Sequence, residues 1–91
     1  MIFVTEYRLK PHMPKSEVKR LMDIFGQRGA AEGEIAHYVR ADGTGGWTIT
    51  ESDDMAAGYA DALAYSEFIT FTTVPVLKID DAVGPIFEYL G

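Results

Sequence analysis

Histidine and tyrosine are the residues of this chain with the widest scope for acid–base chemistry. His12 lies between Pro11 and Pro14, where we expect an exposed loop. His37 precedes Tyr38 in a stretch that reads as a β-strand, so the two side chains should point to opposite faces of a sheet. If His37 faces an enclosed interior, its imidazole could move a proton or bind haem. The structural alternative is a hydrogen-bonded histidine at a strand edge.

Further candidates are aromatic or acidic. Four tyrosines are sufficient to line a pocket, although aromatic residues at strand and helix spacing also pack into cores. They are Tyr7, Tyr38, Tyr59 and Tyr65. Glu6, Arg8 and Glu51 fall at the ends of strands expected to be neighbours. A carboxylate beside a guanidinium there would usually form a cross-strand pair worth about 0.2–1 kcal/mol. A catalytic base would instead need burial and a raised pKa.

Metal and thiol chemistry find little support in the sequence. The chain has no cysteine, which excludes disulfides, thiol nucleophiles, zinc–thiolate sites and iron–sulfur clusters. Five aspartates fall outside the alternating spacing of an EF-hand loop, and helix capping accounts for most of them. They are Asp53, Asp54, Asp61, Asp80 and Asp81. We therefore expect no metal and no cofactor.

The stretch DGTGGWTITE at 42–51 has three glycines in its first five positions. A phosphate-binding loop would run from a strand into a helix N-terminus, often with a lysine. This stretch instead joins two probable strands and has no cation. It therefore predicts a β-hairpin that leads into Trp47, with phosphate binding as the less favoured alternative.

Hydrophobic periodicity predicts the elements that would position these residues. Val18, Leu21, Met22 and Phe25 form one helical stripe, and a similar stripe occurs near the C-terminus. Alternating β-branched and aromatic residues mark four strands. The strands are expected at 2–9, 35–40, 46–51 and 68–76, and the first helix at about 14–27. The second helix should begin with Ser52 as its N-cap and end at about residue 65. A third should begin after 80 or 81, with Pro85 in its first turn.

Two further expectations concern side-chain direction. The second helix should bury Met55, Tyr59, Ala62 and Leu63. By alternation, the pairs 47/49 and 69/71 should face the helices, which would leave the threonine pairs 48/50 and 70/72 on the other face of the sheet.

The order strand, helix, strand, strand, helix, strand predicts an α+β, ferredoxin-like βαββαβ domain spanning 1–91. Such a domain has an antiparallel sheet with two helices on one face, and here a short C-terminal helix follows. The uncovered face needs a partner, and two such faces can pack into a dimeric α+β barrel with a small semi-polar interior. We expect a homodimer through this open sheet face.

Charge and composition limit the other partners. The net charge of −6 disfavours nucleic acid and anionic membranes, and no apolar run approaches the ~20 residues that span a bilayer. The absence of a signal-like N-terminus favours the cytoplasm. Residues 1–40 carry seven of the eight basic groups and five acids, whereas residues 41–91 carry Lys78 and nine acids. The two halves either present solvated helix faces or meet within a protomer or across an interface.

Three segments carry a resemblance to a known group of proteins. The segments HYVRADGTGGWTITESDD (37–54), AYSEFITFTTVPVLKIDDAV (64–83) and the opening FVTEYRLKP resemble an uncharacterised family of about ninety-residue domains in the dimeric α+β barrel superfamily. The resemblance covers nearly the whole chain and implies that fold and a dimer. The superfamily contains cofactor-independent monooxygenases, haem-degrading enzymes, isomerases and ligand-binding regulatory domains. Its haem-degrading members use Asn, Trp and His, and this chain has no asparagine.

The leading hypothesis is a small homodimeric binding or interaction domain for a small organic ligand, aromatic in one version, or for a protein partner. A cofactor-independent monooxygenase acting on a small aromatic substrate is the alternative, and haem binding through His37 is a second one. Whether the chain is an enzyme stays open. The candidate ligand-binding residues are Tyr7, His37, Tyr38, Trp47 and Glu51.

Overall fold

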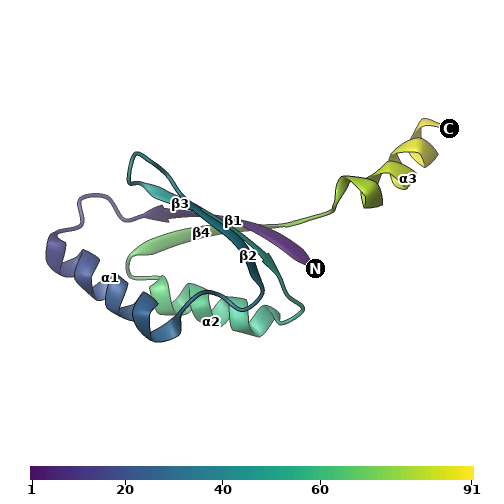
Figure 1. Cartoon of the computed structure of the whole chain (residues 1–91). Helices are drawn as coiled ribbons and strands as arrows, with labels where there is room; N and C mark the ends of the chain where they lie inside the picture. Colours follow the sequence, from purple (N-terminus) through teal and green to yellow (C-terminus); the bar gives the residue numbers. More distant parts are fainter.

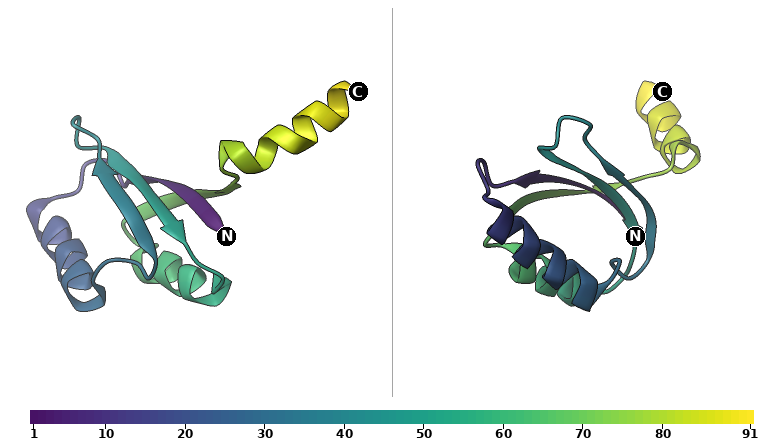
Figure 2. Two further views of the ribbon diagram at one scale, coloured as in Figure 1. Left: turned by 45° about the vertical axis from the view of Figure 1, so that its right-hand side comes forward. Right: turned by 60° about the vertical axis from the view of Figure 1, so that its left-hand side comes forward.

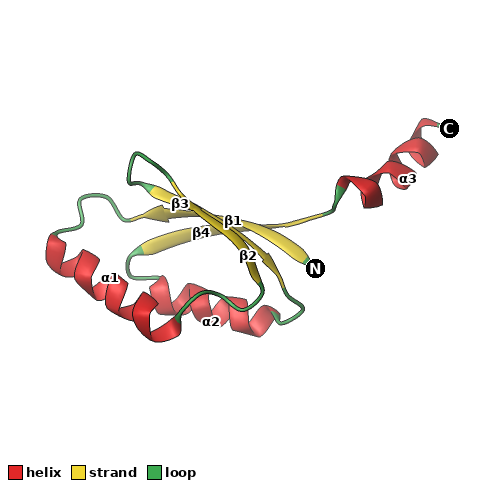
Figure 3. Cartoon of the chain, viewed as in Figure 1, coloured by secondary structure: helices red, strands yellow, loops and turns green.

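The computed structural model describes residues 1–91 and shows one sheet with two helices on one side and a third helix set apart (Figures 1 and 3). The elements follow the order βαββαβα. They are β1 (Ile2–Leu9), α1 (Lys15–Arg28), β2 (Glu34–Val39), β3 (Gly45–Glu51), α2 (Met55–Tyr65), β4 (Ile69–Val76) and α3 (Ile79–Leu90).

The four strands form one antiparallel sheet in the order β2-β3-β1-β4, which confirms the ferredoxin-like arrangement. β1 lies inside the sheet, where Tyr7 is paired with Gly46 of β3 and with Phe71 of β4. β2 and β4 are the edge strands. Pro75, which has no N–H to donate, therefore lies in an edge strand, where a missing ladder hydrogen bond is tolerated.

The sheet curves over α1 and α2 (Figure 2), and the two helices are tied together by charge. Arg28 of α1 donates from Nε and Nη2 to Asp61 Oδ1 of α2, at 2.9 and 2.7 Å. Arg20 donates two hydrogen bonds to Glu67, just beyond α2. These pairs join the basic first half of the chain to the acidic second half within one protomer.

The hydrophobic core is small, since only Phe3, Leu21 and Phe68 among the apolar side chains are buried. Met55, Tyr59 and Leu63 of α2 are each more than half exposed, so the prediction that the second helix buries them is wrong. The stripe exists, but α2 stands off from the sheet instead of packing closely on it. The space left between the two layers forms a cavity.

Two predictions about helix starts were also wrong. Asp54, not Ser52, caps α2, because its Oδ1 accepts from the N–H of Ala57, while the Ser52 hydroxyl accepts from the N–H of Asp54. In α3, Lys78 occupies the N-cap position without a side-chain hydrogen bond, and Pro85 lies inside the helix. The helix therefore starts earlier than expected: the N–H groups of Asp81 and Ala82 bond to the Lys78 carbonyl to form its first turn, and Pro85 is accommodated further along with the loss of one helical hydrogen bond.

Candidate functional site

A cavity of about 810 Å³ lies between the sheet and the two helices. Its volume falls in the range of small-molecule sites, which is roughly 300–1,000 Å³. The sheet contributes Phe3, Tyr7, Leu9, Ile69 and Phe71, and the helices contribute Leu21, Met22, Phe25, Met55, Ala62 and Tyr65. Tyr65 meets the edge of Phe71 at a ring-centroid distance of 6.4 Å, where α2 comes near β4.

Threonine hydroxyls add polar points to this mostly apolar wall. Thr5, Thr48, Thr50 and Thr73 all line the cavity from the sheet. Thr5 and Thr73 are cross-strand partners whose hydroxyl oxygens lie 2.9 Å apart in a hydrogen bond. The cavity can therefore surround an apolar molecule and still offer hydrogen bonds to one or two polar groups on it.

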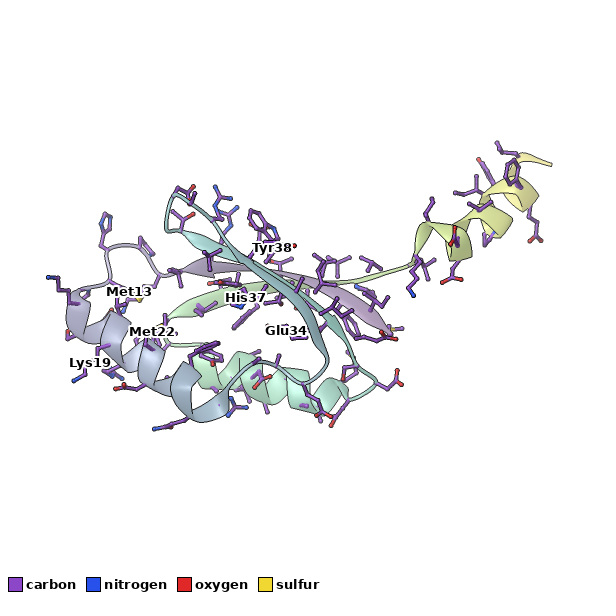
Figure 4. The ribbon with its side chains drawn as sticks, in the orientation of Figure 1. Met13, Lys19, Met22, Glu34, His37 and Tyr38 are labelled. Carbon is purple, nitrogen blue, oxygen red and sulfur yellow. The ribbon has the colours of Figure 1, made fainter.

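The cavity also holds a tyrosine–histidine pair. The Tyr7 hydroxyl lies 2.6 Å from His37 Nε2, and the two rings meet edge to face. His37 Nδ1 lies 3.8 Å from Oε1 of Glu34, three residues earlier on β2, and the shift in strand register between Glu34 and Ala36 puts both side chains on the same side of the sheet (Figure 4). When Nδ1 carries the ring proton and faces Glu34, Nε2 accepts the hydrogen bond from Tyr7. Burial, and then the charge of Glu34, raise the pKa of Tyr7.

A glycine makes this pair possible. Tyr7 is on β1 and His37 is on β2, so the tyrosine ring has to cross β3, the strand between them. It crosses at Gly46, where an added Cβ would lie 2.6 Å from the Tyr7 hydroxyl oxygen and would also meet the backbone oxygen of Tyr38. The sequence predicts Gly46 only as a hairpin residue, and no local signal shows that an aromatic ring passes over it.

The rest of the glycine cluster shapes the hairpin, as predicted. Gly43 has φ +79°, and Gly45 has φ +152° with its Cα against the backbone of Tyr7. Asp42 accepts hydrogen bonds from Arg40 and from the Thr44 hydroxyl, and these contacts hold the pKa of its carboxyl well below the usual value. The cluster therefore joins β2 to β3 and does not lead into a helix.

The structure separates the five candidate residues onto two faces of one sheet. Tyr7 and His37 line the cavity, whereas Tyr38 and Trp47 are cross-strand partners on the opposite face. Figure 4 shows Tyr38 on the other side of the ribbon from His37. Glu51 is paired with Ile2 and lies outside the cavity. The cavity is thus near His37 but not near Trp47.

We call the face that carries Trp47 the open face. It consists of Ile2, Val4, Glu6, Arg8, Ala36, Tyr38, Trp47, Ile49, Glu51, Thr70, Thr72, Val74 and Val76. The predicted directions of 69/71 and 70/72 are confirmed, but those of 47/49 and 48/50 are inverted. Alternation divides a strand into two sets and does not say which set faces the helices. The larger apolar set of β3 lies on the uncovered face.

The charged residues of the open face also differ from the prediction. Arg8 Nη2 lies 2.9 Å from Glu6 Oε1, so this ion pair runs along β1 and not across to Glu51. The Arg40 guanidinium stacks over Trp47, 5.5 Å from the ring centre.

Elsewhere in the molecule, no group of three His, Asp or Glu side chains is placed to hold a metal ion, and no helix is long and apolar enough to cross a membrane.

Comparison with known proteins establishes the family. A profile described as "Domain of unknown function (DUF3303)" matches residues 1–88. The chain is a DUF3303 domain. No curated protein matches it in sequence. Among solved structures, the "Structure of Rv0793 from Mycobacterium tuberculosis" aligns with this DUF3303 domain at 15% identity and a TM-score of 0.44, covering 85% of this chain and 94% of that one.

Proposed function

We propose that this DUF3303 domain binds a small, mostly apolar organic molecule in the cavity between the sheet and the helices. The observation that carries the proposal is the cavity itself: about 810 Å³, walled largely by apolar and aromatic side chains, with polar groups at a few points. A hydrophobic core of three residues in a chain of this length leaves that space for a ligand.

The chemistry of the wall narrows the class of ligand. The Tyr7–His37 pair can donate to or accept from a hydroxyl or carbonyl group, and the threonine hydroxyls offer further hydrogen bonds. The arginines near the cavity are already paired, Arg28 with Asp61 and Arg40 with Asp42. A neutral aromatic molecule with one hydroxyl group, such as a phenol or naphthol, suits this wall better than an anion.

A matched pair of variants tests this binding. Ala62 lines the cavity from α2, whereas Ala60 is an exposed residue of the same helix outside it. With 1-naphthol as the probe in calorimetric titrations, we expect binding by the wild type and by Ala60→Phe. Ala62→Phe should abolish it, because the added ring fills ligand space. Equal binding by both variants would place the probe elsewhere and contradict the proposal.

The open face supports a second part of the proposal, a homodimer. Val4 of β1 lies between Ile49 of β3 and Val74 of β4. Trp47 and its cross-strand partner Tyr38 lie on the same face. Val74 is 51% exposed and Tyr38 is 66% exposed. Two such apolar faces can stack about 10 Å apart, as in other packed sheets. We assign this face to a second copy of the chain and not to a small ligand.

A second candidate function is cofactor-independent oxidation of a phenol, and the Tyr7–His37–Glu34 arrangement favours it. The Tyr7 hydroxyl would take the phenolic proton as it passes its own proton to His37 Nε2, and Glu34 would stabilise the resulting imidazolium. The phenolate would then give electrons to dioxygen, so that one phenol and one O₂ yield one quinone and one water. The apolar wall of the cavity favours such a step by limiting the bulk water around the bound phenol.

Oxygen uptake tests this second candidate. With 1-naphthol and dissolved oxygen, the wild type should consume O₂ and form a naphthoquinone, and His37→Gln should lose this activity while still binding the probe. Uptake that is the same in His37→Gln, or none in the wild type, would refute the enzymatic version and leave the binding proposal intact. We do not extend the proposal to haem, because His37 Nε2 already bonds to Tyr7.

A further inference from the structure

The C-terminal helix α3 lies apart from the rest of the chain. It follows β4 through Leu77 and Lys78, and neither α1, α2 nor the body of the sheet packs against it (Figures 1 and 2). Its apolar stripe is uncovered: Ile79 is 70% exposed, Phe87 68% and Leu90 70%. An isolated helix of 12 residues with an internal proline would be marginal in water. This helix therefore requires a packing surface.

The accessible surface and the radius of gyration of the chain indicate how much surface a partner would bury. Its accessible surface is 6881 Å², whereas a compact monomer of 10.1 kDa would expose about 5,300 Å². Its radius of gyration is 16.0 Å, against about 12 Å for a compact chain of this length. The cavity walls account for part of the excess of about 1,600 Å². The rest is of the order that each chain of a stable homodimer buries.

The direction of α3 points to the place of that contact. In every view, α3 lies on the side of the sheet away from α1 and α2, which is the side of the open face (Figures 1 and 2). A second chain stacked on the open face would lie beside α3, and two-fold symmetry would place its own α3 beside the first chain. The two helices would form a pair of exchanged arms.

The partner surface can be specified further. β4 and β2 are opposite edges of the sheet. If the two-fold axis runs parallel to the strands, β4 of one chain lies over β2 of the other, and α3 reaches the partner's β2 edge. That edge exposes Ile35 (58%), Tyr38 (66%) and Val39 (72%). An exposed apolar edge strand is prone to unwanted pairing unless it is covered.

From these observations we infer that α3 packs its stripe of Ile79, Val83, Ile86, Phe87 and Leu90 across the β2 edge of a second copy of the chain. In this arm exchange each chain places its α3 on the other. The contact adds to the face-to-face dimer and depends on that dimer being formed. It is independent of whether the cavity binds a ligand.

Cross-linking within mixed dimers tests this contact directly. The chain has no cysteine, so Tyr89→Cys, just outside the apolar stripe and 89% exposed, gives one attachment point for a maleimide–benzophenone. Chains labelled with ¹⁴N and ¹⁵N are mixed, irradiated and mapped by mass spectrometry. We expect cross-links that join chains of different isotope and end at residues 35–39. Cross-links confined to one isotope, or an absence of cross-links in a chain that sediments as a dimer, would overturn the inference.

A pair of charge variants measures the contribution of the stripe. Phe87→Asp places a carboxylate in the stripe, and Tyr89→Asp places the same charge outside it. By sedimentation, Phe87→Asp should raise the dimer dissociation constant by about tenfold or more, with Tyr89→Asp close to wild type. Equal effects of the two variants would contradict the arm exchange. If both variants still bind 1-naphthol, the sedimentation result bears on the arm exchange alone and not on the cavity proposal.

Discussion

The two faces of the sheet differ in what covers them. On the helix side, the sheet meets α1 and α2 across a cavity that holds Tyr7, His37 and several threonines. On the open face, Val4, Ile49, Trp47 and Val74 form an apolar surface without any covering element. A cavity with a few polar points suits a small molecule, whereas a broad apolar surface suits another sheet. This contrast underlies the proposal that one face binds a small ligand and the other a second chain.

The largest expected effect is on the open face. Val74 is 51% exposed in the single chain, so Val74→Asp should leave the protomer folded. In a face-to-face dimer it buries two unpaired carboxylates, at a cost of about 3–5 kcal/mol each. We expect the dissociation constant to rise by about a thousandfold or more in sedimentation. Ser16→Asp, an exposed change on α1, is the matched control. A Val74→Asp protein that still forms the wild-type dimer would break the assignment of this face.

The next effect belongs to the cavity side. Gly46→Ala should destabilise the protein by about 1–3 kcal/mol in urea unfolding, because the new methyl group collides with Tyr7 and with the β2 backbone. Gly26→Ala is the control, since a Cβ there meets nothing within 4 Å in α1. It should stabilise by about 0.5–1 kcal/mol. The same sign for both variants would show that Tyr7 does not depend on the space above Gly46.

The smallest effect concerns pH. Burial and Glu34 raise the pKa of Tyr7 in the folded state above the value of about 10 for an unfolded chain. The folded state then holds the phenolic proton more tightly, so the contribution of Tyr7 is complete below about pH 10 and is lost as pH rises through the raised pKa. Unfolding measured from pH 8 to 11.5 should show a shallower decline for Tyr7→Phe. An unchanged slope would mean that the Tyr7 hydroxyl is not in the environment described here.

The order of the elements could be predicted from the sequence because it depends on local patterns. The alternation at Ile2–Leu9 and the stripe through Leu21 indicate β1 and α1 without any long-range information. The turn signals at Asp42 and Gly43 likewise placed the hairpin, and the strand and helix order then gave the ferredoxin-like topology.

The site was only partly predictable, because its geometry depends on long-range contacts. Tyr7 and His37 were both candidates, but their meeting requires Gly46 on the strand between them, and no spacing in the sequence shows that. The face of Trp47 was predicted wrongly. The prediction assumed that the larger apolar residues of β3 face the helices, whereas they lie where a second protein chain would cover them.

Intermolecular nuclear Overhauser effects test the central claim, that the ligand site is on the helix side of the sheet. Methyl groups distinguish the faces: Leu21 and Ile69 line the cavity, and Ile49 and Val74 lie on the open face. In an isotope-filtered experiment with 1-naphthol, we predict contacts from the probe to Leu21 and Ile69 and none to Ile49 and Val74. Contacts to Ile49 or Val74 in place of these, or no contacts at saturating probe, would contradict the account.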